Sequence, residues 1–121
     1  MNDAFVIEAF ISGIGKNSFD KDSVSEDFVW KTNAGSCRDF GALVSHMESV
    51  LSKTVDGIEF TGLRSIVGND VVIYEAAATA RMRNGDIYEN PYCFVADLID
   101  GKIKCVMEYG NTLRSSKAFA E

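Results

Sequence analysis

Phenol and carboxamide side chains recur at every second position in part of the stretch from Asn84 to Asn111. In a β-strand, Tyr88, Asn90 and Tyr92 would project from the same face. These groups hydrogen-bond carbonyls and hydroxyls, whereas a dry core more usually carries Val, Ile or Leu at such positions. The spacing predicts that this face lines a ligand pocket, and a protein interface is the alternative.

Three carboxylates within strand patterns are candidates for acid–base chemistry: Glu108, Glu75 and Asp97. Glu108 shares its predicted strand face with Val106 and Gly110, and burial in an apolar cavity would raise its pKa toward a value useful for proton transfer. The alternative is that Glu108 pairs with a lysine or arginine and has no part in chemistry. Glu75 needs either a polar partner or a place in the same cavity, and Asp97 is expected on the outer face.

Residue usage argues against several other kinds of chemistry. His46 is the only histidine, and Cys37, Cys93 and Cys105 are widely spaced without a C-x-x-C pair. A metal site, a Ser-His-Asp triad of ordinary type and a disulfide framework are therefore not indicated, and we expect free thiols and a His46 at the surface. Glycine-rich phosphate motifs are absent, so no cofactor is expected.

Composition is typical of one globular domain spanning residues 1–121, with 46% hydrophobic and 25% charged residues. The formal net charge of −6 argues against nucleic-acid binding, which needs a basic face. Asp3 and Glu8 near the N-terminus, without a basic region, indicate no signal peptide. No apolar run approaches the roughly 20 residues of a membrane span. We therefore expect a cytoplasmic protein without a membrane partner.

The first half of the chain has helical patterns around one short strand. Apolar residues recur with helical period over 38–52, and Ser36 followed by Asp39 resembles a capping arrangement. Residues 3–15 form a second amphipathic pattern that weakens at Gly13 and Gly15. The predicted elements are helices over 3–15 and 38–52, a short helix or turn over 18–24, and a strand over 28–32.

The second half has four strand patterns separated by turn signals. Asn84-Gly85 and Asp100-Gly101 each predict a two-residue type I′ hairpin turn, because these residues tolerate positive φ. Pro91 lies inside a strand pattern, which indicates an edge position or a bulge. The predicted antiparallel strands cover about 56–67, 70–83, 86–99 and 102–113.

The predicted turn at Asn84-Gly85 also fixes an expected register. A two-residue loop pairs Arg83 with Asp86 and continues outward along both strands. The resulting cross-strand pairs are Arg81 with Tyr88, Thr79 with Asn90, Ala77 with Tyr92, and Glu75 with Phe94.

Several of these residues also carry a family resemblance. The run of Gly85, Tyr88, Asn90, Tyr92, Asp100-Gly101-Lys102-Ile103 and Glu108-Tyr109 resembles the C-terminal half of SnoaL-like proteins. This family belongs to the nuclear transport factor two-like superfamily, with ketosteroid isomerase, limonene epoxide hydrolase and scytalone dehydratase. The resemblance implies an α+β fold with a cone-shaped, curved, mainly antiparallel sheet and N-terminal helices packed on its concave face.

The resemblance also bears on the candidate site. Asp27 to Thr32 is similar to the segment that ends in the aspartate general base of ketosteroid isomerase, but this chain has Thr32 there, which does not titrate near neutral pH. Many cyclase-like members read Glu-Tyr-x-Asp at the end of the last strand, where this chain has Asn111. Glu108 occupies a position similar to a working carboxylate of limonene epoxide hydrolase.

Together, these observations predict a domain that binds a small apolar or polyketide-like ligand. Family analogy suggests isomerase, dehydratase, cyclase or hydrolase chemistry, with Glu108 as the catalytic group. The competing hypothesis is a non-catalytic dimerisation module, because Ile103, Cys105, Met107 and Tyr109 alternate on one apolar strand face. Homodimer formation fits both hypotheses. The expected ligand-binding residues are Trp30, Thr32, Tyr88, Asn90, Tyr92 and Asn111.

Overall fold

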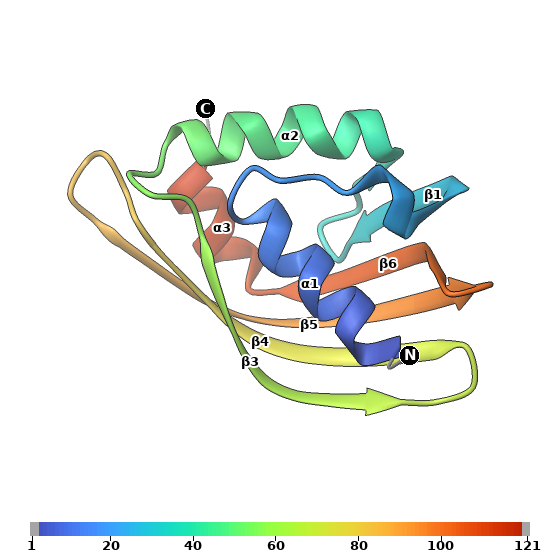
Figure 1. Ribbon diagram of the computed structural model, residues 1–121. Coiled ribbons are helices and arrows are strands. Elements are labelled where there is room, and N and C mark those ends of the chain that lie inside the picture. Colours follow the sequence, from blue (N-terminus) through green and yellow to red (C-terminus); the bar gives the residue numbers. More distant parts are fainter. Residues whose placement is uncertain (1–2, 120–121) are drawn as a thin grey trace.

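Residues 3–119 are described by a computed structural model, in which helices pack on a six-stranded sheet around one hydrophobic core (Figure 1). The strand order is β2-β1-β6-β5-β4-β3, and the sheet is not closed. All neighbouring strands are antiparallel except β1 and β6, which are parallel. The predicted α+β fold with a mainly antiparallel sheet is confirmed. In chain order the elements are α1 (Asp3–Ile14), the 3-10 turn η1 (Lys21–Ser23), β1 (Val24–Thr32), β2 (Cys37–Arg38), α2 (Phe40–Ser52), β3 (Glu59–Val67), β4 (Val71–Arg81), β5 (Ile87–Ile99), β6 (Lys102–Gly110) and α3 (Thr112–Phe119).

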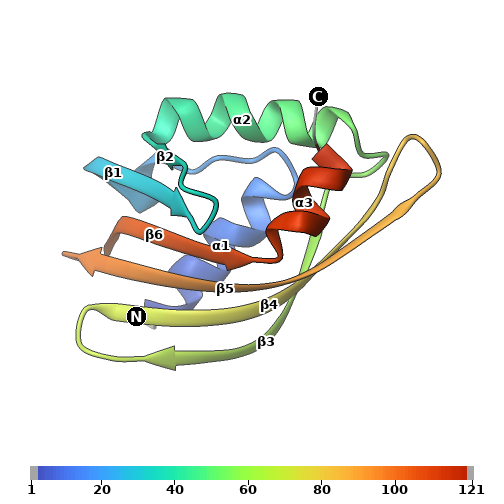
Figure 2. The ribbon, with the colours of Figure 1, turned by 180° about the vertical axis from the view of Figure 1, so that it is seen from behind.

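The long strands β3, β4 and β5 bend, and the helices lie on the concave side of the sheet (Figure 1). Seen from behind in Figure 2, α3 follows directly from β6 and lies near the C-terminal end of α2. The concave face of the sheet, on which the helices lie, is called the inner face below.

Helix α1 forms because its apolar residues follow the helical repeat. Ile7, Ile11 and Ile14 are buried on one stripe, and Phe10 packs edge-on against Phe28 of β1. The helix ends at a close backbone contact, because the Ile58 amide donates to the Gly15 carbonyl at 2.8 Å. A Cβ on Gly15 would lie 2.2 Å from the Ile58 carbonyl oxygen, so no larger residue fits here.

Helix α2 begins at Phe40, two residues after the expected start at residue 38, and Ser36 is not its cap. Asp39 is the N-cap, and its carboxylate accepts from the Ala42 amide at 2.8 Å. Leu43, Met47 and Val50 form the buried stripe that the sequence predicted.

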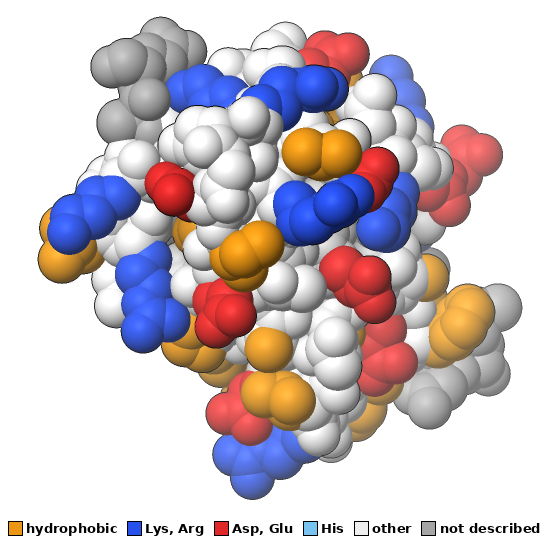
Figure 3. Space-filling model, turned by 90° about the vertical axis from the view of Figure 1, so that its left-hand side faces the viewer, with side chains coloured by type: hydrophobic (Ala, Val, Ile, Leu, Met, Phe, Trp, Pro, Cys, Tyr) orange, Lys and Arg blue, Asp and Glu red, His pale blue; other side chains and the backbone are white. Residues whose placement is uncertain are grey.

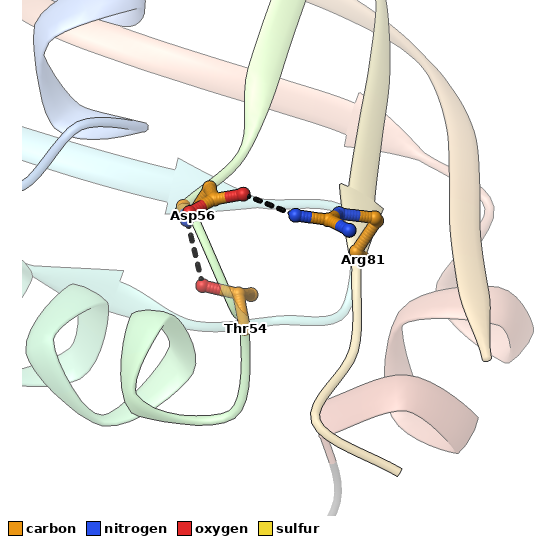
Figure 4. Close-up of polar contacts among 4 residues, drawn as sticks. Thr54, Asp56 and Arg81 are labelled. Atoms are coloured by element: carbon orange, nitrogen blue, oxygen red, sulfur yellow. Dashed lines mark hydrogen bonds and ion pairs between the residues drawn. The ribbon is translucent and has the colours of Figure 1, made fainter. Parts of the chain in front are cut away.

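The loop after α2 is fastened to the end of β4. The Val55 amide donates to the Arg81 carbonyl at 2.8 Å. Thr54 is buried, and its hydroxyl accepts from the Gly57 amide at 3.0 Å. Figure 4 shows this turn together with the exposed ion pair between Asp56 and Arg81. The C-terminal end of α2 therefore has a fixed position over the sheet.

The predicted two-residue turn at Asn84-Gly85 is wrong. Gly85 has φ of +96°, but Asn84 is not among the residues with positive φ, and Gly85 donates back to the Met82 carbonyl at 3.0 Å. The loop therefore has one residue more than a two-residue turn. At the other hairpin, Asp100 and Gly101 both have positive φ, as a type I′ turn requires.

The extra loop residue shifts the register of β4 against β5 by one position. Ala80, Ala78 and Ala76 lie opposite Tyr88, Asn90 and Tyr92, in place of the expected arginine, threonine and Ala77. A one-residue shift exchanges the two faces of a strand. The inner face of β4 is consequently lined with alanines, whose small side chains leave room for the tyrosine rings of β5.

Strand β6 differs from its prediction in two ways. It ends at Gly110, and residues 112–119 form helix α3, which the sequence did not indicate. A register shift between Asp97 and Leu98 marks a bulge that turns Ile103 to the inner face, where it is fully buried. Ile103 is thus not part of the outer face with Cys105, contrary to expectation.

Pro91 lies at an edge, as one of its two predicted settings required. Strand β5 pairs with β4 from Ile87 onward, but with β6 only from Tyr92 onward. Pro91 therefore occupies a stretch of β5 that has a neighbour on one side only. No register shift interrupts β4 and β5 at this point.

Candidate functional site

A cavity of about 290 Å³ lies between the inner face of the sheet and the helices. Its walls are mostly apolar, and a few polar groups from distant parts of the chain reach it. The aromatic and aliphatic lining includes Trp30, Phe60, Tyr92, Phe94, Leu43 and Met47.

Aromatic rings form the sheet side of this cavity. Phe94 is in ring contact with Trp30, Phe60 and Tyr92, with centroid separations of 5.8, 6.0 and 5.5 Å. Gly110 permits this packing, because a Cβ there would lie 2.6 Å from the Tyr92 ring. The result is an aromatic-lined apolar chamber suited to an unsaturated or ring-shaped molecule.

Glu108 supplies the carboxylate of the cavity. In the parallel register of β1 and β6 it lies opposite Thr32, so both side chains face inward. Burial raises the pKa of Glu108 to about 7, and a hydrogen bond from Trp30 and the charge of Arg38 partly oppose that rise. In the described part of the chain, ion pairs are formed by Arg64 and Arg81, and none is formed by Glu108.

Tyr92 lines the cavity, whereas Tyr88 and Asn90 do not. Asn90 is buried, and its amide nitrogen donates to the Tyr88 hydroxyl at 2.7 Å and to the Asn111 carbonyl at 3.1 Å. The Tyr88 and Tyr92 hydroxyls lie 2.5 Å apart. Burial is the main cause that raises the pKa of both phenols. The expectation that Tyr88 and Asn90 border the same cavity as Tyr92 is wrong. Both side chains instead contact the Tyr92 hydroxyl outside the cavity lining.

Asn111 also lies away from the cavity lining. Its side-chain oxygen accepts from the Arg114 amide at 3.1 Å, which makes it the cap of α3. The backbone amide of Asn111 donates to the Asn90 side-chain oxygen at 3.1 Å. The residue at the position where the sequence resemblance implies an aspartate thus starts a helix and is exposed to solvent.

Thr32 and Trp30 line the cavity, as the sequence predicted for both. The Thr32 hydroxyl oxygen accepts weakly from the Ser36 amide at 3.3 Å, so the hydroxyl hydrogen can still be donated to a ligand.

Arg38 and His46 reach the cavity and were not identified as candidates from the sequence. Arg38 lies opposite Trp30 on β2, which a strand returning after the Asn33–Ser36 turn would have revealed. Burial, and next the charge of Arg38, lower the pKa of His46.

Helix α3 contributes further lining that its sequence does not signal. Thr112, Ser115, Ser116 and Phe119 border the cavity, although α3 has no fully buried residue. Phe119 packs edge-on against Tyr88, with ring centroids 4.8 Å apart. The mean hydropathy of α3 is low, and the predicted last strand extended into its first two residues, so the helix was not expected.

Residues 3–119 bring no three His, Cys, Asp or Glu side chains together as a metal site would require. Within the same range, no helix has the length and apolar character needed to span a membrane. The end of the molecule in Figure 3 has acidic and basic side chains intermixed, with hydrophobic side chains in small separate groups.

Comparison with protein-family models and with curated proteins finds no match for this sequence. Solved structures do match in fold. IdmH, a proposed polyketide cyclase from Streptomyces antibioticus, is 12% identical, with a TM-score of 0.81 over 100% of both chains. A proposed SnoaL-like polyketide cyclase from Jannaschia sp. CCS1 is 12% identical, with a TM-score of 0.78 over 98% of this chain and 91% of that one.

An epoxide hydrolase from M. tuberculosis, similar to limonene epoxide hydrolase, also shares the architecture. It is 15% identical, with a TM-score of 0.73 over 97% of this chain and 88% of that one. At such low identity the matches define the fold alone. The chain has the cone-like α+β fold of SnoaL-like and ketosteroid isomerase-like proteins, as the sequence resemblance implied.

Proposed function

We propose that this chain, acting as one domain, binds a small apolar molecule with a few oxygen atoms, and that Glu108 transfers protons to and from it. The observation that carries the proposal is a carboxyl group without an ion pair, set in an apolar cavity that raises its pKa to about 7. Such a group exists in both protonation states near neutral pH, which suits it to act as base and then as acid.

The neighbouring groups have supporting roles. The Glu108 carboxylate takes a proton from a carbon next to a ligand carbonyl, which leaves an enolate. The same carboxyl then returns its proton to carbon, or to a departing oxygen. Thr32 donates a hydrogen bond to a ligand oxygen, and Trp30 orients the carboxylate. Isomerisation, dehydration and cyclisation next to a carbonyl contain such a step, whereas in a hydrolase reaction the same carboxylate would take its proton from a water molecule.

Structures of the same fold are consistent with a small ligand. TerC has been co-crystallised with polyporic acid, and a ketosteroid isomerase-like protein from Catenulispora acidiphila has been solved with trimethylamine. These ligands belong to those proteins. They support the proposal because they show that this fold can hold small molecules.

Proton exchange tests the proposal without knowledge of the natural ligand. The probe is 2-tetralone, an apolar bicyclic ketone, and NMR in D₂O follows the loss of its C–H signals. We expect the protein to speed this exchange over buffer, and Glu108→Gln to remove most of the gain. Glu89→Gln, on an exposed outward position of β5, is the matched control. Exchange at the buffer rate with the natural sequence, or undiminished exchange with Glu108→Gln, would contradict the proposal.

We also propose a cytoplasmic homodimer. Cys105 and Met107 are half-buried on the outer face of β6, and Tyr109 beside them is 46% exposed. Free thiols at Cys37, Cys93 and Cys105 suit a reducing compartment. Met107→Glu should give a monomer by light scattering because it places a charge in the interface. A monomer at micromolar concentration with the natural sequence would contradict dimer formation.

A further inference from the structure

Arg38 is the cation of the cavity, and strand pairing puts it there. Residues Cys37–Arg38 form β2, which runs antiparallel to β1 with Arg38 directly opposite Trp30. Directly opposite residues project to the same face, so the Arg38 side chain shares the inner face with Trp30. Arg38 is half-buried and lines the cavity.

Arg38 differs from every other arginine of the chain. Arg64 and Arg81 form ion pairs with Glu75 and Asp56, each at 2.6 Å. The guanidinium groups of Arg83 and Arg114 donate to the backbone carbonyls of Ser52 and Glu89, at 2.9 and 3.2 Å. Within residues 3–119 Arg38 has neither an ion pair nor a hydrogen bond through its side chain. The one guanidinium on the cavity is the one without an oxygen partner.

The surroundings of Arg38 do not supply a substitute partner. Glu108 lies on the same cavity, beyond ion-pair distance, and exists partly as the neutral acid near pH 7. His46, also at the cavity, carries no negative charge in either protonation state. A guanidinium offers a rigid fork of donors that fits two oxygens of an anion side by side. Its donors therefore remain available to a ligand.

We infer that the ligand carries an oxyanion, either a carboxylate or an ionised enol, on a flat apolar body, and that Arg38 binds this oxyanion. The inference rests on the proposed function, because it names the class of molecule that occupies the same cavity. Aromatic side chains favour contact with a ring of the ligand, so the lining by Trp30, Phe60 and Phe94 and the cavity volume of about 290 Å³ suit a flat body of that size. Arg38 is thus a specificity residue, and Glu108 remains the proton-transfer group.

A pair of matched probes tests the carboxylate. 2-Naphthoate and its neutral analogue 2-naphthamide have nearly the same shape and differ in charge. Trp30 is the only tryptophan of the chain and lines the cavity, so its fluorescence reports binding directly. We expect the natural sequence to bind naphthoate about tenfold more tightly than naphthamide, as a charge-assisted hydrogen-bonded pair permits.

Three variants assign the preference to Arg38. Arg38→Gln should reduce the preference to about twofold or less, with little change in naphthamide affinity. Arg38→Lys keeps the charge without the planar fork, so it should retain part of the preference. Lys31→Gln is the matched control, since Lys31 neighbours Trp30 but is exposed, and the net charge changes equally. Circular dichroism and melting curves verify that each variant is folded.

A second pair of probes separates the two sources of the oxyanion. 2-Hydroxy-1,4-naphthoquinone presents an ionised enol, and 2-methoxy-1,4-naphthoquinone is its neutral counterpart. The NMR signal of the Trp30 indole N–H reports the binding of both naphthoquinones. Preference for the anion in either pair, lost in Arg38→Gln, supports the inference and identifies which oxyanion is bound.

The remaining outcomes overturn the inference that Arg38 binds an oxyanion, and they do so in distinguishable ways. Equal affinity for anionic and neutral probes, or a preference unchanged in Arg38→Gln, overturns the inference and leaves the proposed function standing. If neither member of either pair shifts the Trp30 signals, the cavity does not bind such molecules, and the proposed function fails together with the inference.

Discussion

Two glutamates on the same sheet lie in different surroundings, one at the surface in an ion pair and one in the cavity. Glu75 lies on the outer face of β4, opposite Cys93 of β5, and its carboxylate is 2.6 Å from the Arg64 guanidinium on β3. Glu108 lies on the inner face of β6, opposite Phe94, within an apolar cavity and without an ion pair. One carboxylate is neutralised at the surface, and the other is held where it can exchange protons with a ligand.

The difference shows that strand face decides what a carboxylate can do. Both residues follow apolar stretches and look alike in sequence. A one-residue register error would have placed Glu75 beside the tyrosines of β5, and the observed register removes it from them. On the outer face Arg64 lies within ion-pair distance of Glu75, whereas on the inner face burial disfavours the charge of Glu108 and Arg38 stays beyond ion-pair distance.

The largest expected effect concerns the pH dependence of proton exchange. Glu108 must be ionised to act as a base, and its pKa is raised to about 7. The protein-dependent exchange of 2-tetralone should therefore rise about tenfold per pH unit below that pKa and level off above it. Glu75→Gln should leave the profile unchanged. A profile already flat between pH 5 and pH 8 would show that Glu108 is not the base.

The next effect concerns stability. Folding raises the pKa of Glu108 from 4.5 to about 7, so between these values the native state holds a proton that the unfolded state has released. The contribution of Glu108 to the free energy of unfolding is therefore present below pH 4.5 and is lost as the pH rises to about 7, by up to about 3 kcal/mol. Urea titrations at several pH values should show this decline, and Glu108→Gln should flatten it.

A smaller effect is expected behind the cavity. Asn90 is buried and bonded to both Tyr88 and the Asn111 backbone, so Asn90→Ala leaves buried polar groups without partners. The free energy of unfolding should fall by about 2 kcal/mol. Asn84→Ala, in the exposed hairpin loop, should lower the free energy of unfolding by much less. Equal losses in the two variants would show that the Asn90 network is unimportant.

The smallest effect belongs to the outer glutamate. Arg64 and Glu75 have side chains that are 64% and 37% exposed, so solvent screens their attraction. Glu75→Gln should change the free energy of unfolding by less than about 1 kcal/mol, and added salt should narrow the difference. A loss of unfolding free energy as large as that of Asn90→Ala would contradict the view that this exposed ion pair contributes little to stability.

The sequence predicted the elements with strong periodicity and missed those fixed by local geometry. Helix 38–52 and the four late strands follow from their apolar patterns and turn residues. Helix α3 is short and mostly polar, and the predicted last strand extended into its first two residues, so the helix was missed; it packs beside β5. The predicted length of the loop at Asn84-Gly85 was wrong, because the same dipeptide also suits a three-residue turn with positive φ at the glycine alone.

The candidate site was predictable to the same extent. Trp30, Thr32, Tyr92 and Glu108 follow from strand alternation together with the family resemblance, and the structure brings all four to one cavity. Alternation could not separate Tyr92 from Asn90, because the two share a face and differ only in depth. Arg38 was missed because β2 has two residues, too few to form a pattern.

The parallel pairing of β1 with β6 affects how the chain reaches its native state. Thr32 and Glu108 meet across this pair, although most of the chain separates them in sequence. Such a distant contact carries a large loop-closure cost and tends to form late. Strands β3 to β5 can associate as a meander before β6 is available. We therefore expect a nascent chain to pair β3, β4 and β5 first, and to bring Thr32 and Glu108 together only when β6 is inserted between β5 and β1.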